Sequence, residues 1–202
     1  MSKPIYLASQ SPRRLELLRQ IGLLPTVLRL RNNHPRADVD ETPLPGEAAD
    51  DYVRRLAIEK AGTGLLAIAD RALPVLPVVA ADTTVVLDGA ILGKPADAVA
   101  AANMLRRYSG RGHRVLTGVA VALNGRMEVA VSESEVRFKS LTESEIAAYV
   151  GSREWIDKAG GYGIQGRAAV LVEWISGSYS GVMGLPLHET AELLKSTGFE
   201  VW

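Results

Sequence analysis

The sequence predicts an α/β fold built on a mixed β-sheet with flanking helices. Apolar runs of strand length alternate along the chain with segments of helical spacing. Two pairs of apolar runs are separated only by Asp88-Gly89 and Asn124-Gly125, dipeptides that are typical of two-residue hairpin turns. Hydrophobic residues make up 47% of the 202 positions, which is enough for a sizeable core. Helices are mixed with strands along the chain, and the two hairpins require antiparallel pairs of strands. We therefore expect a mixed sheet.

The first part of the chain predicts a strand, a helix, a second strand and a loop. The run "PIYLAS" is typical of a buried strand. A helix is expected to begin at Ser11-Pro12, because serine can cap a helix and proline is tolerated at its first position, and to end at Gly22. "LPTVLRLR" predicts the second strand, and the polar, turn-rich "NNHPRADVDETPLPGE" predicts a loop suited to function.

The rest of the chain continues this alternation. Thr142 with Glu145 three residues later forms the pattern of a capping box, and "DKAGGYGIQGRA" and "SYSGVMGLP" predict loops. The predicted elements are a helix over 47–69, a strand and hairpin over 75–95, a helix over 96–107, a longer hairpin over 113–138, a helix over 142–150, a strand over 169–177 and a closing helix over 186–196.

Composition restricts the classes of function. The formal net charge is +0, which argues against broad electrostatic binding to nucleic acid or to an anionic membrane. The absence of cysteine excludes disulfides, thiolate zinc sites and a cysteine nucleophile, and it fits a reducing compartment. We see no signal peptide and no membrane span, and the three histidines lack metal-binding spacing. We therefore expect a cytoplasmic protein without nucleic-acid or membrane partners.

Asp82 and Thr83 interrupt the apolar run "VVAADTTVV". They could form a solvent-facing pair at the end of a strand. A carboxylate inside such a run, however, costs about 3–5 kcal/mol when its partner is missing. This cost favours a functional role for Asp82.

Basic residues stand at three junctions. Arg13 and Arg14 fall in the first turn of a predicted helix, where the helix dipole is already positive, so they suit a bound phosphate better than their own helix. The alternative is a pair of solvated charges. Lys60 lies on the apolar side of a long helix and either snorkels or points into a cleft. Lys94, between a hairpin and a helix, would on spacing alone be an ordinary surface lysine.

Several motifs resemble those of one known family over nearly the whole chain. In order, they are "LASQSPRRLELL", "DVDET", "YVRRLAIEKA", "AADTTVVLDGAILGKP", "MLRRYSGRGHRVLTGVAV", "WIDKAGGYGIQGRA" and "GSYSGVMGLPLHET". They resemble the Maf family of nucleoside triphosphate pyrophosphatases, also called septum-formation inhibitors. The resemblance implies a single domain over 1–202, with an elongated mixed sheet and two lobes around a central cleft, similar to inosine triphosphate pyrophosphatase. It also implies a homodimer.

Three positions indicate the branch of this family. Members that act on dTTP and UTP carry an arginine after "SP", a threonine after the catalytic aspartate and a glutamine in "GIQG". Here these residues are Arg13, Thr83 and Gln165. Members that act on 7-methyl-GTP tend to have "SPWRR" and "SDQ" instead. The chain therefore resembles the dTTP/UTP branch.

The resemblance also implies roles for individual residues. Asp82 matches the proton acceptor and could ligate a metal, and Glu41 is a second carboxylate suited to Mg²⁺ or Mn²⁺. Thr83 and Gln165 would read the base, together with Arg13. The expected phosphate-binding residues are Ser9, Arg13, Arg14, Lys60 and Lys94.

The expected reaction is metal-assisted attack of water at the α-phosphorus of dTTP or UTP, giving the monophosphate and pyrophosphate. Family-level roles in division arrest and in cleaning the nucleotide pool go with it, and modified pyrimidine nucleotides are further candidate substrates. Two alternatives stay open: a 7-methyl-GTP-type pyrophosphatase, and a nucleotide-binding regulator of septum formation without catalysis. A nucleic-acid binder is a poorer third, because no basic-aromatic stripe is present.

Overall fold

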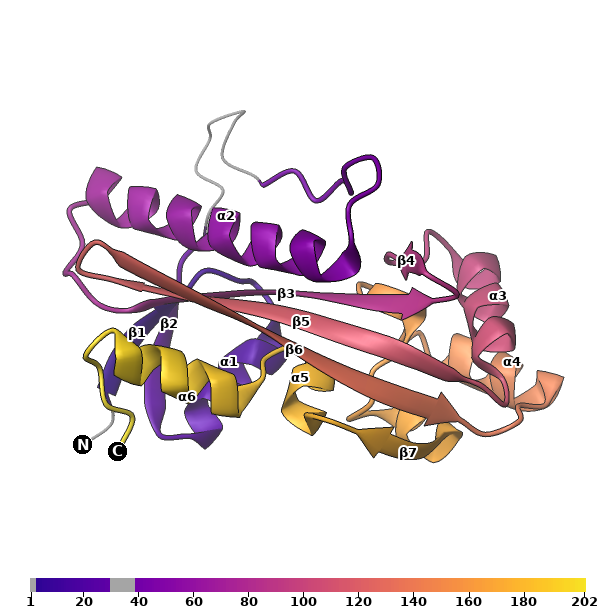
Figure 1. The fold of residues 1–202 in the computed structure, drawn as a ribbon. Coiled ribbons are helices and arrows are strands. Elements are labelled where there is room, and N and C mark those ends of the chain that lie inside the picture. The colour runs from indigo at the N-terminus through magenta and orange to yellow at the C-terminus, as the bar shows by residue number, and fades with distance from the viewer. Residues whose placement is uncertain (1–2, 30–38) are drawn as a thin grey trace. The chain divides into compact units, whose positions relative to one another are not determined.

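The computed structural model describes residues 3–29 and 39–202. In this part of the chain seven strands form one sheet, in the order β2-β1-β3-β5-β6-β7, with β4 paired to β3 (Figure 1). The strands are β1 (Lys3–Leu7), β2 (Leu23–Val27), β3 (Val78–Leu87), β4 (Ala90–Leu92), β5 (Gly112–Leu123), β6 (Arg126–Phe138) and β7 (Val172–Ser176). The helices are α1 (Pro12–Gln20), α2 (Ala49–Asp70), α3 (Ala98–Tyr108), α4 (Glu143–Gly151), α5 (Tyr179–Met183) and α6 (Leu187–Ser196), with 3₁₀ helices η1 (Ala159–Gly161) and η2 (Arg167–Leu171).

The sheet mixes parallel and antiparallel pairs, which confirms the predicted fold class. β1 pairs parallel with both β2 and β3. β4 pairs antiparallel with β3, and β7 pairs antiparallel with β6. The β3–β4 pair comes from a tight turn, whereas the parallel pairs need the long crossovers that contain α1 and α2.

Both predicted hairpin turns form with the expected backbone. Asp88 and Gly89 have φ angles of 54° and 77°. Asn124 and Gly125 have φ angles of 52° and 77°. Positive φ at both central residues is the requirement of a type I′ turn, which is why Asp-Gly and Asn-Gly mark these positions.

Local differences from the sequence prediction lie at helix and strand ends. Pro12 is the first residue of α1 as expected, but the Ser11 side chain makes no capping hydrogen bond, so its predicted capping role is wrong. The capping box of Thr142 and Glu145 at α4 is confirmed.

The strand predicted over 169–177 starts only at residue 172, because η2 occupies the preceding residues. The predicted loop over 178–186 contains the short helix α5. The second predicted strand ends at Val27, and its last two residues, 30 and 31, lie outside the described residues, as does the 32–38 part of the predicted loop. Of the described helices, none combines the length and apolar character needed to cross a membrane.

The chain forms two compact units. Unit 1 contains residues 1–82, 117–132 and 184–202, and unit 2 contains 83–116 and 133–183. The unit boundaries after residues 82, 116 and 132 fall inside β3, β5 and β6, respectively. These three strands therefore contribute residues to both units. The single domain expected over 1–202 stays a prediction.

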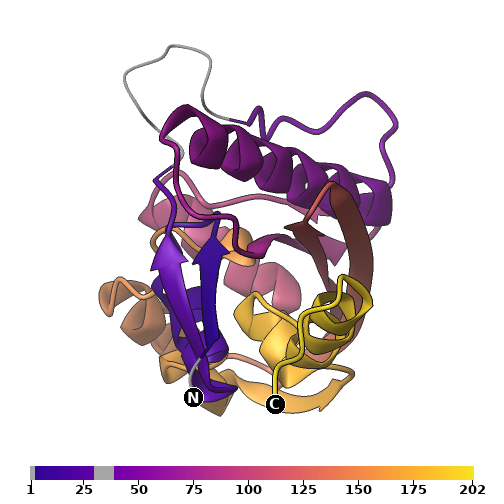
Figure 2. The same cartoon turned by 90° about the vertical axis from the view of Figure 1, so that its left-hand side faces the viewer.

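The core of unit 1 is built from α2 against the sheet. Ala57, Ala61 and Ile68 of α2 pack with Tyr6 of β1 and with small or branched residues of β3 and β5. Figure 2, an end-on view, shows α2 lying across these strands. The approach is closest at Gly118 of β5, where an added Cβ would lie 2.3 Å from the carbonyl oxygen of Val53. Only glycine therefore lets α2 reach this position on the sheet.

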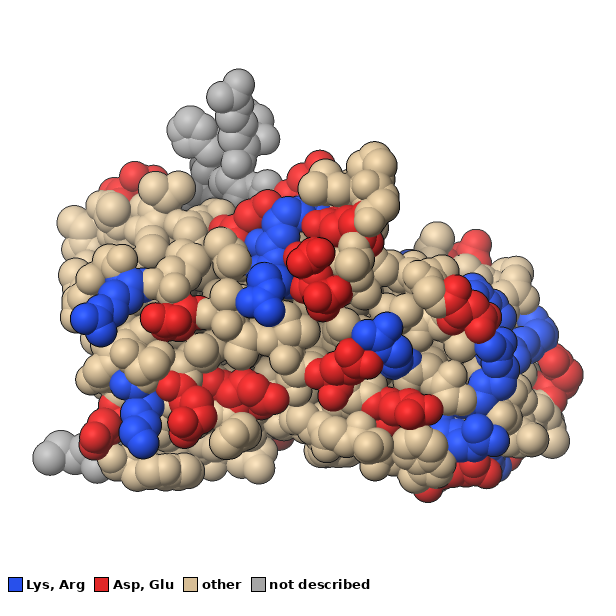
Figure 3. Space-filling view, viewed as in Figure 1, with Lys and Arg blue, Asp and Glu red and all other residues tan. Residues whose placement is uncertain are grey.

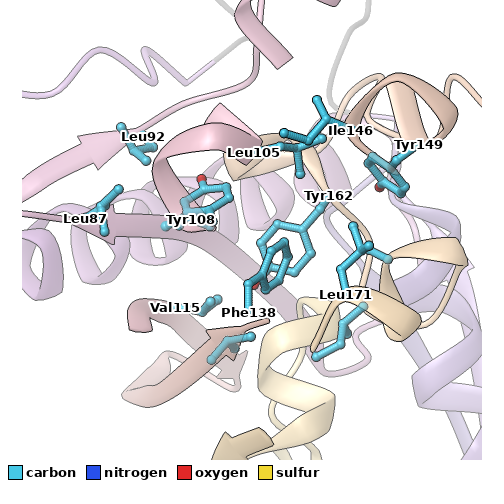
Figure 4. Packing of buried hydrophobic residues seen from close by; sticks show 14 residues of the cluster. Leu87, Leu92, Leu105, Tyr108, Val115, Phe138, Ile146, Tyr149, Tyr162 and Leu171 are labelled. Carbon is cyan, nitrogen blue, oxygen red and sulfur yellow. The ribbon is translucent and has the colours of Figure 1, made fainter. Parts of the chain in front are cut away.

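The core of unit 2 is aromatic at its centre. The rings of Tyr108, His113, Phe138 and Tyr162 are in mutual contact, with centroid distances of 4.4–5.9 Å, in mostly edge-to-face geometry. Figure 4 shows three of these side chains: Tyr108 comes from α3, Phe138 from β6 and Tyr162 from the loop directly after η1. The Tyr108 hydroxyl donates to the Gly160 carbonyl at 3.0 Å, and His113 Nε2 lies 2.8 Å from the Tyr162 hydroxyl. The cluster thus ties the glycine-rich segment around η1 to the sheet.

We predict that Gly118→Ala destabilises the protein, because the added methyl group meets backbone that cannot rotate away. The expected loss in the free energy of unfolding is about 1–3 kcal/mol or more. Gly62→Ala is the matched control. Gly62 lies inside α2, and apart from its chain neighbours and the adjacent helix backbone no described atom comes within 4 Å of the place its Cβ would take, so alanine there should raise stability by up to about 1 kcal/mol. Denaturant unfolding of both variants measures the difference, and equal effects would contradict the close packing of α2.

We also predict an acid-dependent loss of stability from His113. Burial lowers the pKa of His113 to about 4. The unfolded state therefore binds a proton that the folded state does not, so this stability is complete above about pH 6.5 and is lost as pH falls from about 6.5 towards 4. The slope reaches about 1.4 kcal/mol per pH unit.

Denaturant unfolding between pH 7.5 and 4.5 tests this pH dependence. The double variant His113→Phe/Tyr162→Phe removes both polar partners but keeps four aromatic rings in the cluster. In this variant the free energy of unfolding should depend less on pH. Tyr162→Phe alone keeps the buried imidazole and should retain the wild-type slope. An unchanged slope in the double variant would assign the pH dependence to other groups.

Candidate active site

Asp82 lies in the middle of β3, among residues that are otherwise almost all buried. Its side chain is only 11% exposed, so its charge needs a partner. The partner is Lys60 of α2, whose Nζ lies 2.6 Å from Asp82 Oδ1. Both residues belong to unit 1. The pairing explains how an aspartate is tolerated within an apolar strand.

Lys60 contacts a second carboxylate at the same time. Its Nζ also lies 2.6 Å from Oε1 of Glu41, and the lysine side chain is only 12% exposed. The Lys60 ammonium therefore contacts two carboxylates rather than snorkelling to solvent, while the cleft expected around it stays a prediction. Lys60, Asp82 and Glu41 thus form a carboxylate–ammonium–carboxylate triad.

Glu41 is held by contacts between its segment and α2. The Tyr52 hydroxyl donates to the backbone carbonyl of Glu41 at 2.8 Å. Arg55, three residues further along α2, binds both carboxylate oxygens of Glu47 at 2.6 and 2.8 Å, and Glu47 in turn accepts from the backbone N–H of Leu44. We call these contacts the 41–47 clamp. They fix the backbone of Glu41 although its side chain is 48% exposed.

Arg14 lies in the first turn of α1, within the same unit. Its Nε donates to the Gly184 carbonyl at 2.7 Å, and its Nη1 donates to Ser9 Oγ at 3.1 Å. Ser9 Oγ also accepts a hydrogen bond from the backbone N–H of Ser11. This bond stabilises the turn between β1 and α1. These bonds hold the guanidinium at the N-terminal end of the helix.

The charges of this region act on one another. Burial lowers the pKa of Arg14, the negative charges of Asp82 and Glu41 oppose that effect, and the charge of Arg13 adds to it. Burial, followed by the charges of Asp82 and Glu41, raises the pKa of Tyr52 to about 12. Tyr52 therefore remains a protonated donor to the backbone at neutral pH. The structure thus brings Arg13, Arg14, Glu41 and Asp82 into one electrostatic environment.

The other predicted site residues belong to unit 2. Thr83 follows Asp82 on β3 and is half-buried, while Lys94 and Gln165 are exposed. The loop of Lys94 is tied to η1 by a hydrogen bond from the Gly160 N–H to the Gly93 carbonyl at 3.0 Å. Gln165 follows η1 by four residues.

The triad also has the chemistry of a divalent-metal site. Two carboxylates converge on one cation, which here is the ammonium of Lys60. Mg²⁺ is commonly held by one or two carboxylates together with substrate phosphates and water, so Glu41 and Asp82 fit this requirement. The described residues contain no group of three or more histidine, cysteine, aspartate or glutamate side chains that could hold a metal ion. Within this part of the chain, such side chains alone therefore do not form a complete metal site.

Several exposed charges outside the site are paired with charges of opposite sign. Arg106 and Arg111 contact Glu143 and Asp88 at 2.7 and 2.5 Å. On the face shown in Figure 3, blue and red groups lie beside each other and do not form one broad basic surface.

Comparison with known proteins places the chain in a family. The family model described as Maf-like protein matches residues 4–197. The chain belongs to the Maf family. A relative named dTTP/UTP pyrophosphatase from Aromatoleum aromaticum is 55% identical over 197 residues, covering 96% of each chain. Relatives of the same name from Nitrosomonas europaea and Dechloromonas aromatica are 52% and 53% identical, covering at least 96% of each chain.

Sequence reasoning missed three residues of this Maf protein that position the site. Tyr52, Arg55 and Glu47 make the 41–47 clamp and were not predicted to matter. A signal was present, because Tyr52 and Arg55 stand three residues apart on α2 and therefore share one side of the helix. The polar composition of that helix face indicates a contact with another charged segment, although not with which one.

We predict that Arg55→Gln loosens the segment that carries Glu41, because the two-point contact with Glu47 is lost. Amide hydrogen exchange of residues 40–47 should become faster, while exchange of the cores stays unchanged. Arg106→Gln, which breaks a similar two-point pair with Glu143 in unit 2, is the control and should leave this segment unaffected. Unaltered protection in Arg55→Gln would mean that other contacts hold Glu41.

Proposed function

We propose that this Maf protein hydrolyses dTTP and UTP to the corresponding monophosphate and pyrophosphate. The observation that carries the proposal is the triad of Glu41, Lys60 and Asp82 beside Arg14, in a chain more than half identical to relatives named dTTP/UTP pyrophosphatase. Cleavage of a phosphoanhydride needs neutralised phosphate charge, a positioned water and an acceptor for its proton. The residues of the site can supply all three.

Phosphate charge would be met from several directions. Arg13 and Arg14 lie at the N-terminal end of α1, where the backbone N–H groups and the helix dipole also favour an anion. Ser9 already accepts a bond from Arg14, and its hydroxyl could turn towards a phosphate oxygen. Lys60 and Lys94 would bind the remaining phosphate oxygens.

Asp82 would accept the proton of the attacking water. Its carboxylate lies on the buried strand β3, which holds it in place as a general base requires, and in the resting site it pairs with Lys60. A divalent cation held by Glu41 and Asp82, Mg²⁺ or Mn²⁺, would supply further neutralisation of charge on the phosphates. Water then adds to the α-phosphorus, its proton passes to Asp82, and pyrophosphate leaves.

Base selection would come from unit 2. Gln165 offers both a donor and an acceptor to the edge of a pyrimidine, and Thr83 offers a hydroxyl next to Asp82. Arg13 would contribute to selection as well as to phosphate binding. We also propose a cytoplasmic homodimer, supported by the absence of cysteine and by the family resemblance.

A nucleotide panel tests the proposed activity directly. The purified protein is given each canonical and several modified triphosphates with Mg²⁺ or Mn²⁺, and pyrophosphate is measured. Release from dTTP and UTP ahead of the others is expected. Preference for 7-methyl-GTP would move the chain to the other branch of the family, and binding without turnover would favour a regulator of septum formation.

We predict that Asp82→Asn folds normally but loses about 10²–10⁴-fold in kcat for dTTP, because the amide cannot accept the proton. Asp88→Asn is the matched control, since Asp88 lies at an exposed turn and asparagine tolerates its positive φ. The control should retain wild-type turnover. Full activity of Asp82→Asn, with both variants folded by circular dichroism, would refute the role of Asp82.

A further inference from the structure

We infer that Lys60 and a divalent cation compete for the carboxylates of Glu41 and Asp82, so that the cation enters the site together with the nucleotide and not before it. The inference rests on the proposed function, in which these two carboxylates hold the metal. It adds an order of binding and a second role for Lys60.

Geometry gives the first argument. One ammonium nitrogen lies 2.6 Å from an oxygen of each carboxylate, so it stands between them. Mg²⁺ requires carboxylate oxygens at about 2.0–2.1 Å in an octahedral arrangement. A cation that bridged Glu41 and Asp82 would occupy the place of the ammonium. Lys60 must therefore leave when such a cation arrives.

Charge gives the second argument. The two carboxylates are balanced by the cations of Lys60 and Arg14, and Arg13 adds a further positive charge to this environment. A divalent cation that arrived alone would meet a region whose carboxylates are already neutralised. The incoming cation would also be repelled by the positive charges of Lys60, Arg14 and Arg13. Because Lys60 and Asp82 are both nearly buried, solvent ions screen this repulsion less than they would at the surface.

A triphosphate removes both obstacles. It brings several negative charges, which offset the incoming cation, and it offers phosphate oxygens to the displaced ammonium. Lysine is suited to this exchange, because its ammonium is a compact charge on a flexible four-carbon stem. The contact of Lys60 with the carboxylates and its proposed contact with phosphate are then two successive positions of one side chain.

The order of binding can be measured without any turnover. Mn²⁺ is titrated into the protein and the free ion is followed by electron paramagnetic resonance, first alone and then with a dUTP analogue whose α–β bridge cannot be hydrolysed. Lys60→Met removes the ammonium and keeps most of the stem. Lys195→Met, at an exposed position of α6 in the same unit, removes the same charge outside the site.

We expect Lys60→Met to bind Mn²⁺ alone at least tenfold more tightly than the wild type, and Lys195→Met to stay within twofold of it. The analogue should tighten Mn²⁺ binding at least tenfold in the wild type and by a smaller factor in Lys60→Met. Adding Glu41→Gln to Lys60→Met should abolish the gain, which places the ion at the carboxylate pair. Thermal unfolding shows that each variant is folded, and Lys60→Gln serves in place of Lys60→Met should that variant unfold.

Equal or weaker Mn²⁺ binding in the folded Lys60 variant would overturn the competition. In that case Lys60 would organise the carboxylates for the ion rather than exclude it. This outcome is separate from failure of the proposed function. A wild type that releases no pyrophosphate from any nucleotide would remove the function, whereas the Mn²⁺ titrations would still report whether Lys60 and the cation compete.

Discussion

The site depends on the contact between Lys60 and Asp82. A carboxylate in the middle of an apolar strand is tolerated only with a cation beside it, and the cation comes from a helix that must lie close to the sheet. Gly118 permits that approach, because any side chain there would push α2 away at Val53. The packing of small residues under α2 therefore serves the electrostatics of Asp82 as well as the core.

The same helix controls the second carboxylate. Tyr52 and Arg55 hold the segment of Glu41, so α2 supplies the ammonium and also positions the group that the ammonium contacts. Arg14 approaches from α1, and a backbone carbonyl and the Ser9 hydroxyl fix the direction of its guanidinium. The basic residues at the start of α1 weaken their own helix, and this cost is offset when an anion binds. In the resting site the two carboxylates are thus neutralised and Arg13 leaves a surplus positive charge, which suits an anionic substrate that carries its own cation.

Sequence reasoning succeeded where the determinants are local. The two type I′ turns, the capping box at α4 and the start of α1 at Pro12 follow from residues a few positions apart. The expectation that Asp82 needs a partner was also local, because it follows from a charge within an apolar run, and Lys60 is that partner; the catalytic role of Asp82 stays a prediction. The contacts of Tyr52 and Arg55 in the 41–47 clamp span only 8 to 11 residues, but they join α2 to a segment without helix or strand, so the partners of these two residues could not be read from the sequence. The 3₁₀ helix η2, two of whose residues are buried in the core of unit 2, could not be predicted from its local sequence.

The boundary between the units has a consequence for how specificity can change. Asp82 ends one portion of unit 1 and Thr83 begins unit 2, so a proposed catalytic residue and a proposed base-reading residue are neighbours on one continuous strand. Unit 2 cannot be exchanged as a cassette, because its borders cut β3, β5 and β6 within their hydrogen-bonded lengths. A crossover between relatives at these borders would join half-strands from two parents and place side chains of different origin beside each other within β3, β5 and β6. Point substitution at Thr83 avoids such joins, because it changes one side chain within an intact strand.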